Sequence, residues 1–316
     1  MPVSESKFHA DRASGIGATD SPKILGESKW GGPLSVYLSK TDPGDPDSPS
    51  LPARVGIALE PMVAQLWSED TGVKLRADKR HYRHPARDWM VCHLDYRPIG
   101  DRSHIVECKT RSSASGFGED GSPIIPRDIW IQVQHELAVT GAKTADVAVL
   151  IGFTDFRVHP VVRDDDFING LYERIDQFWH DHVIPRVPPS AGRGDGPTIA
   201  RAHPSDDGSI LIADDSQQTL LGAYASARAY LADAEATVEE IESALKQHIG
   251  DATGIAGSSG TVTWKRSRDR EVIDWKAVAQ DAGAQPWQID LRTTLRGGNR
   301  IFRWSPSGKS STGDDD

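Results

Sequence analysis

Residues 91–110 read VCHLDYRPIGDRSHIVECKT, and this stretch decides the fold. Two runs of apolar and β-branched residues, VCHLDYR and HIVECKT, flank a turn that contains proline, glycine and aspartate. We therefore predict an antiparallel hairpin. Because side chains alternate along a strand, Glu107 and Lys109 share one face and Cys108 takes the other. Asp95 on the partner strand can become their cross-strand neighbour, so two carboxylates and a lysine meet on one side of the sheet.

Two carboxylates in this arrangement suit a divalent ion. Mg²⁺ and Mn²⁺ prefer oxygen ligands, and such an ion can activate water and neutralise charge on a scissile phosphodiester. Cys92 and Cys108 are the only cysteines, which excludes a disulfide framework and a cysteine-rich zinc site. Both are predicted to be buried apolar residues. The alternative is that the acidic residues and the lysine form the solvated face of a β-ribbon.

Helical and strand signals alternate on both sides of the hairpin, which predicts a mixed α/β fold. In the third helix Pro61 is expected in the first turn, where proline is tolerated, and Gly72 is expected to end the helix. One helix is predicted to begin after Asp20. Four more are predicted at residues 33–40, 57–71, 127–140 and 164–183, and further strands are predicted at 146–153 and 156–162.

The C-terminal third follows a segment rich in proline and glycine. We predict a core at residues 1–185, a linker at 186–213 and an extension at 214–316. The extension should open with a long helix from Asp214 to Ile249, followed by strands in TVTWKR and IFRW. One stripe of that helix carries Leu220, Leu221, Tyr224, Ala227, Leu231, Ala234, Val238, Ile241 and Leu245.

Composition limits the classes of protein. The chain has 316 residues, of which 37% are hydrophobic and 26% charged, which is typical of a folded protein with a large core. No stretch approaches eighteen consecutive apolar residues, and the N-terminus has no apolar run, so we expect neither a membrane span nor a secretory signal. We therefore expect the protein in the cytoplasm, which is the cytoplasm of the host cell if a phage encodes the protein. With a net charge of -10, any contact with DNA must be local.

Four blocks in order resemble the PD-(D/E)xK nuclease superfamily, and more narrowly the YqaJ-like viral recombinase family, whose relatives include lambda exonuclease and the RecE nuclease. The blocks are GIGATDSPKILGESKWGGPLSVYLSKT, VGIALEPMVAQLWSEDTGV, HLDYRPIG with IVECKT, and IWIQVQHELAVTGA. The resemblance implies a PD-(D/E)xK nuclease core, which is a central mixed β-sheet flanked by helices. It also covers the C-terminal long helix and β-hairpin extension, which look like the tail of phage members.

The resemblance also implies roles for the residues of the second and third blocks. Asp95 and Glu107 would be metal ligands, and the backbone carbonyl of Cys108 would be a further ligand. Lys109 would orient or polarise the attacking water. Glu60 would complete the acidic set through a metal-bound water or a second ion.

The last block and the first add candidates of other kinds. Residues two apart on a helix diverge by about 200°, so only one of Gln132 and Gln134 can face the site, and Gln134 is favoured. His135 is expected to be a packed or an exposed histidine and not a metal ligand. Arg12 and Thr19 would cradle a 5′-phosphate at a helix start; the alternative is an ordinary helix cap with Arg12 in solvent.

Basic residues of WKRSRDR, among them Lys265 and Arg266, could track a DNA backbone or form a solvated face. Together with the acidic set, the resemblance implies a deoxyribonuclease, a Mg²⁺-dependent 5′→3′ exonuclease on double-stranded DNA ends, with Mn²⁺ as a substitute. It also implies that the enzyme leaves 3′ single strands for an annealing protein of the RecT or Beta type and, because relatives form rings, that it assembles as a ring-shaped trimer or tetramer. The alternatives are a related endonuclease and a non-catalytic protein that binds DNA ends or a partner.

Overall fold

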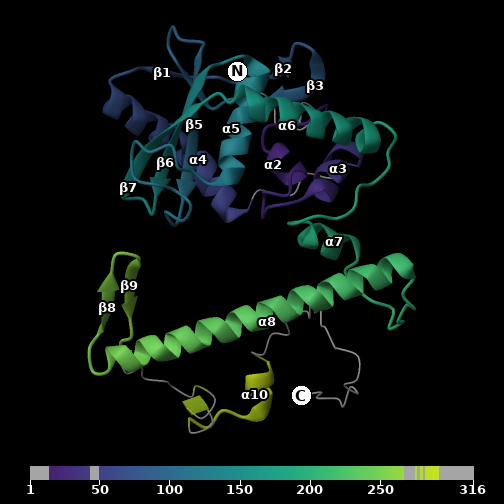
Figure 1. Cartoon of the computed structure of the whole chain (residues 1–316), viewed down its shortest axis with the longest axis vertical. Helices are drawn as coiled ribbons and strands as arrows, with labels where there is room; N and C mark the ends of the chain where they lie inside the picture. The colour runs from purple at the N-terminus through teal and green to yellow at the C-terminus, as the bar shows by residue number, and fades with distance from the viewer. Residues whose placement is uncertain (1–13, 43–49, 267–274, 276–277, 280–281, 292–316) are drawn as a thin grey trace. The chain divides into compact units, whose positions relative to one another are not determined.

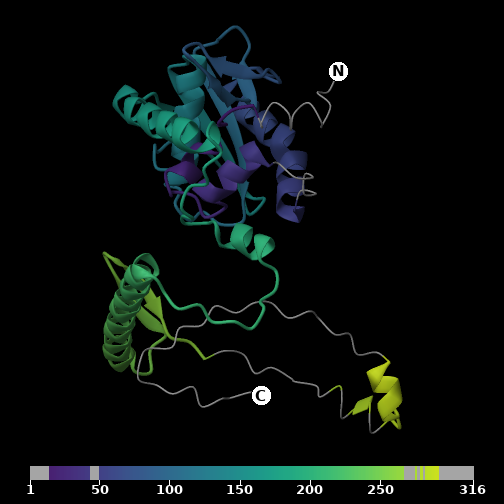
Figure 2. The ribbon, with the colours of Figure 1, turned by 90° about the vertical axis from the view of Figure 1, so that its right-hand side faces the viewer.

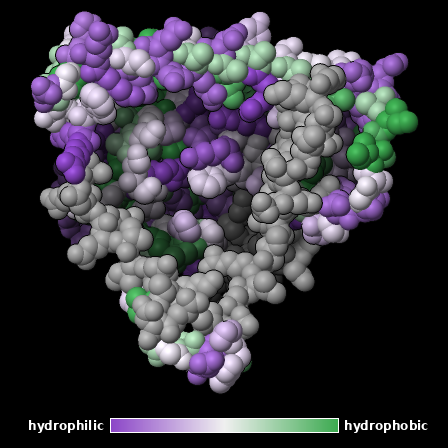
Figure 3. Space-filling model, turned by 90° about the horizontal axis from the view of Figure 1, so that it is seen from below, coloured by the Kyte–Doolittle hydropathy of each residue, from purple (hydrophilic) through white to green (hydrophobic). Residues whose placement is uncertain are grey.

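The computed structural model describes residues 14–42, 50–266, 275, 278–279 and 282–291. The chain divides into two compact units, Met1–His203 and Pro204–Asp316 (Figures 1 and 2). Among the described residues, no helix combines the length and the apolar composition that crossing a membrane requires. On the face drawn in Figure 3, hydrophilic residues surround small hydrophobic groups, as expected for an acidic folded chain.

A five-stranded mixed sheet forms the centre of the first unit. Its order is β1 (Leu75–Ala77), β4 (Tyr96–Pro98), β5 (His104–Arg111), β6 (Thr144–Ile151) and β7 (Asp155–Val162). Strands β5 and β6 run parallel, joined by the crossover helix α5 (Arg127–Thr140), and the other neighbours are antiparallel. The predicted fold class, a central mixed sheet flanked by helices, is confirmed.

Helices cover both faces of this sheet, and alternation along β5 explains how. Ile105 joins the larger core cluster with Val133 and Leu137 of α5. Val106 and Cys108 point the other way and pack in a second cluster under α4 (Leu51–Thr71). On the α5 side the cluster extends to α2 (Ser21–Ile24), α3 (Pro33–Thr41) and α6 (Asp165–Phe178), which continues as the π-helix η1 (Trp179–Val183).

The first strand of the predicted hairpin is divided in two. Only β4 pairs with β5, through Tyr96 and Val106. The preceding residues belong to β3 (Arg87–Cys92), which pairs with β2 (Tyr82–His84) in a separate two-stranded sheet. A continuous strand from Val91 to Arg97 is therefore wrong, because β2 holds β3 and the chain must turn before it joins β5. Asp95 lies in that break.

Helix α4 begins six residues earlier than predicted. It starts at Leu51, with Pro52 in the first turn, so Pro61 lies inside the helix and not at its start. The expectation for Pro61 is wrong because the residues before Ile57 continue the helix back to Ser50. Proline has no N–H to bond the carbonyl four residues back, which leaves the Ile57 carbonyl without that partner. Gly72 ends the helix in the left-handed conformation, with φ 71°, as predicted.

The segment after α6 is anchored by a buried aspartate. Asp195, fully buried, accepts hydrogen bonds from four backbone N–H groups, those of Gly32, Leu34, Ser35 and Gly192. Three of these groups lie at the start of α3, where N–H groups have no partner within the helix. The first compact unit therefore continues past residue 185 and includes α7 (Gly196–Ala202).

The second unit contains the predicted long helix. Helix α8 (Asp215–Ile249) begins with a capping box formed by Asp214 and Gln217. A hairpin follows, with β8 (Gly254–Gly257) antiparallel to β9 (Gly260–Thr263), which confirms a strand in TVTWKR. The later α10 spans Pro286–Asp290, and the strand expected in IFRW, residues 301–304, lies outside the described residues.

Candidate active site

The site is built around two side chains of β5. Glu107 and Lys109 project together toward α5, as alternation along a strand predicts, and Lys109 Nζ lies 2.5 Å from Glu107 Oε1. Glu107 is 3% exposed, so its carboxylate depends on protein partners and not on bulk water. Cys108 points to the opposite face, where its thiol is buried.

Asp95 is tied to the same strand by its side chain. Its Oδ2 accepts a hydrogen bond from the Cys108 N–H at 2.9 Å, which fixes the carboxylate beside Glu107. Its own carbonyl accepts from the Asp78 N–H at 2.9 Å, which fixes the backbone in the break between β3 and β4. The predicted meeting of Asp95, Glu107 and Lys109 is therefore present in the structure.

Gln132, and not Gln134, faces this cluster. The Gln132 amide donates to Glu107 Oε1 at 2.6 Å, and its oxygen accepts from Lys109 Nζ at 3.1 Å. Gln134 instead donates to the Val162 carbonyl and accepts from the Asp164 N–H on the far side of the helix. The expectation that Gln134 faces the site is wrong, because the apolar side of α5 that packs on the sheet turns Gln132 toward β5.

A third carboxylate, Glu136, was not predicted to be part of the site. It lies one turn after Gln132 on the same face of α5, and its Oε1 accepts from the Gln132 amide at 2.9 Å. Glu136 is fully buried, and its Oε2 has no hydrogen-bond partner among the described residues. The signal in the sequence was the four-residue spacing from Gln132, which becomes informative only once the orientation of Gln132 is known.

Carboxyl groups outnumber basic groups in the cluster, and this raises several pKa values. Burial raises the pKa of Asp95 well above its usual range, and Glu107 raises it further. Burial together with Glu107 does the same to the pKa of Glu136. Burial alone would lower the pKa of Lys109, but Glu107 and Asp95 outweigh this effect and raise it. Lys109 is therefore an ammonium group, a hydrogen-bond donor and not a base, at neutral pH.

Glu60 reaches the cluster from α4. Its side chain is 24% exposed and lies 3.8 Å from Lys79 Nζ. Burial raises the pKa of Glu60 most, Lys79 opposes this effect, and Glu107 adds to it. The glutamate predicted on this helix is therefore close enough to Glu107 for the two charges to interact.

A buried network supports the backbone at Asp95. The Asp78 carboxylate accepts hydrogen bonds from Arg80 and from the Tyr82 hydroxyl, and it pairs with Arg97 at 3.2 Å. Burial raises the pKa of Asp78, but the hydrogen bonds of Arg80 and Tyr82 prevail and lower it to about 2. Because Asp78 holds the Asp95 carbonyl through its own N–H, this network positions Asp95.

The donor set fits a small divalent cation. Asp95 and Glu107 offer carboxylate oxygens, and Glu136 adds a buried carboxyl oxygen that has no hydrogen-bond partner among the described residues. Within the described ranges no three histidine, cysteine, aspartate or glutamate side chains are grouped as a complete metal cage. Mg²⁺ is commonly bound by one or two carboxylates, with water and substrate phosphate as the other ligands, so such a set is sufficient.

The remaining predicted residues lie elsewhere. Thr19 is exposed next to Asp20, whose buried carboxylate forms an unpredicted ion pair with Lys40 at 2.7 Å. Arg12 lies outside the described residues. Lys265 and Arg266 are exposed and belong to the second unit.

The two cysteines are buried, as predicted, and His135 is packed and not exposed. His135 is fully buried and bonds to Ser21 and to the Val91 carbonyl; burial lowers its pKa to about 4. Cys92 and Cys108 are free buried thiols, and burial raises the pKa of each. Neutral imidazole and protonated thiols of this kind act as core side chains.

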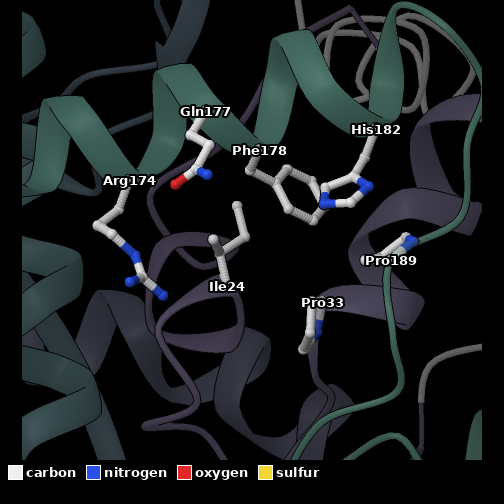
Figure 4. Close-up of a pocket in the computed structure, with 7 residues that line it drawn as sticks. All are labelled: Ile24, Pro33, Arg174, Gln177, Phe178, His182 and Pro189. Atoms are coloured by element: carbon white, nitrogen blue, oxygen red, sulfur yellow. The ribbon is translucent and has the colours of Figure 1, made fainter. Parts of the chain in front are cut away.

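A pocket of about 330 Å³ lies apart from the acidic residues, along α6 and η1 (Figure 4). Its lining contains none of the predicted site residues. It consists of Ile24, Pro33, Arg174, Gln177, Phe178, His182 and Pro189.

Comparison with known proteins places the site inside a matched region. Residues 7–143 match the YqaJ-like viral recombinase domain. The chain is also 29% identical over 259 residues, 79% of its length, to the uncharacterized protein YqaJ of Bacillus subtilis (strain 168), of which it covers 80%. The resemblance noted in the sequence is thereby confirmed.

Two solved structures share parts of the fold at low similarity. An alkaline exonuclease, LHK-Exo, from Laribacter hongkongensis is 14% identical with a TM-score of 0.43, covering 56% of this chain and 91% of its own. A phage related exonuclease from Haemophilus somnus 129PT is 12% identical with a TM-score of 0.41, covering 52% and 91%. At these values the likenesses carry no functional conclusion.

Proposed function

We propose, from the match of residues 7–143 to the YqaJ-like viral recombinase domain, that the chain is a metal-dependent deoxyribonuclease that degrades double-stranded DNA from its ends in the 5′→3′ direction. One observation carries the proposal. Asp95, Glu107, Lys109 and Gln132 meet within that domain, from three separate elements, in hydrogen-bonding contact around a surplus of carboxylates.

Asp95 and Glu107 would hold the divalent ion, with the Cys108 carbonyl as a further ligand and Glu60 acting through water or a second ion. When bound, Mg²⁺ would supply neutralisation of phosphate charge and a lowered pKa for water. Mn²⁺ would substitute, because it takes the same oxygen ligands. Neither ion requires a cysteine thiol, in agreement with the buried position of Cys108.

The side chains of the chain itself would position the reactants. The Lys109 ammonium would donate a hydrogen bond to the attacking water and hold it in line with the phosphorus. Gln132 would keep Lys109 and Glu107 in register, because its amide bonds to both. In the reaction the water oxygen bonds to phosphorus and releases a proton to the solvent, the bond from phosphorus to the 3′ oxygen breaks, and that oxygen takes up a proton.

The direction of digestion and the product rest on the N-terminal block. Arg12 and Thr19 would receive the 5′-phosphate of the DNA end, and the charge of the neighbouring Asp20 is already compensated by Lys40. The product, a duplex with a 3′ single strand, would pass to a single-strand annealing protein of the RecT or Beta type in phage recombination. A trimeric or tetrameric ring would keep this acidic protein on DNA, and Lys265 and Arg266 would contact the backbone.

The proposal is tested with linear duplex DNA that carries a 5′-phosphate on each strand and a label at one end. We expect mononucleotides in Mg²⁺ and none in EDTA, with the 5′ label released before the 3′ label. Closed circular DNA of the same sequence serves as the control substrate. Cleavage of the circle at the same rate, or earlier release of the 3′ label, would contradict the proposed exonuclease.

A further inference from the structure

Helix α8 carries a heptad repeat whose large apolar side chains are mostly exposed. Apolar residues recur at alternating spacings of four and three from Leu220 to Leu245, the spacing of a coiled-coil seam. The full seam consists of Leu220, Tyr224, Ala227, Leu231, Ala234, Val238, Ile241 and Leu245. A seam sustained over this length indicates a helical partner of equal length.

The seam is open to solvent along much of its length. Leu220 is 70% exposed, Leu231 47%, Val238 54% and Ile241 55%. An apolar stripe on a helix of this length gains stability mainly by packing against another surface. The order of large and small residues along the seam indicates which partner helix fits it.

We infer that α8 pairs with α8 of a second copy of this chain in an antiparallel coiled coil. In the antiparallel register centred between Leu231 and Ala234, large seam residues face smaller or equal ones. Leu231 faces Ala234 of the second copy, and Val238 faces its Ala227. In a parallel register Ala227 and Ala234 would each face their own copies and leave gaps, which a packed seam avoids.

Charge selects the same orientation. Arg228 and Glu235 flank the seam at equivalent positions one heptad apart, and both side chains are exposed. No ion pair within the described residues engages either of them. Antiparallel pairing brings Arg228 of each copy next to Glu235 of the other. The two-fold axis therefore generates two equivalent ion pairs.

The pairing fixes the parity of the assembly. A two-fold contact joins copies in pairs, so it favours a dimer or a tetramer built from two dimers over a trimer. The inference stands apart from the proposed nuclease, because the acidic cluster lies in Met1–His203 and α8 in Pro204–Asp316. A catalytically inactive protein would still assemble in this way.

Charge exchange on the full-length protein tests the pairing, with molar mass from light scattering across a micromolar dilution series. Arg228→Glu and Glu235→Arg should each weaken the dimer by at least tenfold in dissociation constant, and the double variant should restore it. Glu239→Arg, on the opposite side of the helix, is the matched control and should leave the mass unchanged. A parent protein that is monomeric throughout, or a double variant no tighter than the single ones, overturns the inference.

Disulfide trapping tests the direction of the helices. Leu220→Cys combined with Leu245→Cys should give a covalent dimer on oxidation, whereas Leu220→Cys alone should not, because antiparallel helices hold the two copies of residue 220 far apart. The parent protein, whose two thiols are buried, is the oxidation control. A covalent dimer of the Leu220→Cys variant alone would show parallel pairing and overturn the inference.

Discussion

Two glutamines on one helix provide a matched test of the site. Gln132 and Gln134 are both buried, at 9% and 0% exposure, but only Gln132 contacts Lys109 and Glu107. We predict that Gln132→Ala lowers turnover by more than its loss of stability explains, and that Gln134→Ala impairs stability and leaves turnover intact. The same change two residues apart thus separates catalysis from folding.

The magnitudes follow from the hydrogen bonds that each variant loses. Without Gln132 the Lys109 ammonium loses one of its two anchors, and misplacement of a positioning group by about 1 Å costs about 10²-fold in rate, which is about 2.7 kcal/mol of transition-state stabilisation. Without Gln134 the Val162 carbonyl and the Asp164 N–H are left unsatisfied, at about 1–3 kcal/mol each. In a unit of this size that loss lowers the melting temperature by about 4–24 °C.

The assay measures release of mononucleotides from linear duplex DNA and thermal unfolding of the same samples. Rates are compared at a temperature at which circular dichroism shows both variants to be folded. If Gln134→Ala loses turnover at full stability, or if Gln132→Ala loses turnover only in proportion to its melting temperature, the assignment of Gln132 to the site is wrong.

Three further predictions concern other parts of the first unit. Lys109→Ala should abolish turnover and keep the metal affinity that calorimetry measures, whereas Asp95→Ala should lose both. Equal metal affinities of the two variants would contradict these roles. Asp195→Ala should lower the free energy of unfolding in urea by about 3–5 kcal/mol, because it leaves four backbone N–H groups without a partner. Asp207→Ala, at an exposed aspartate, is the control and should lower it by under about 1 kcal/mol. Similar losses in the two variants would show that Asp195 is not an anchor. Asp78, whose pKa falls from 3.8 to about 2 on folding, contributes about 2 kcal/mol above pH 4 that is lost as the pH falls toward 2, and Asp78→Asn should abolish this part of the acid dependence of unfolding.

The parts of the fold that local rules govern were predictable. Alternation along β5 placed Glu107 and Lys109 on one side before any tertiary contact was known. Helical periodicity predicted α5 and α8 to within one residue at each end. These features depend on neighbours close in sequence, which a pattern records.

The parts that failed depend on contacts between distant residues. The break before β4 exists because β2 holds β3, and nothing within residues 91–97 indicates that pairing. The rotation of α5, which turns Gln132 inward, is fixed by how Val133 and Leu137 pack on the sheet. The Asp195 anchor joins residues 163 positions apart, so a proline- and glycine-rich segment gave no sign that it carries a buried carboxylate.

The acidic cluster itself argues for a function beyond folding. Because burial and mutual repulsion raise the pKa values of Asp95 and Glu136, their contribution to stability is fully present below the unfolded pKa and is lost as the pH rises through the folded one. At neutral pH these groups therefore destabilise the chain, opposite in sign to Asp78, which neighbours them and stabilises it. A buried carboxylate that served packing alone would be replaced by its amide at a gain in stability. A cluster of buried carboxyl groups that lower the stability of the fold is typical of catalytic and metal-binding sites. A cation bound to the ionised carboxylates would offset this loss of stability.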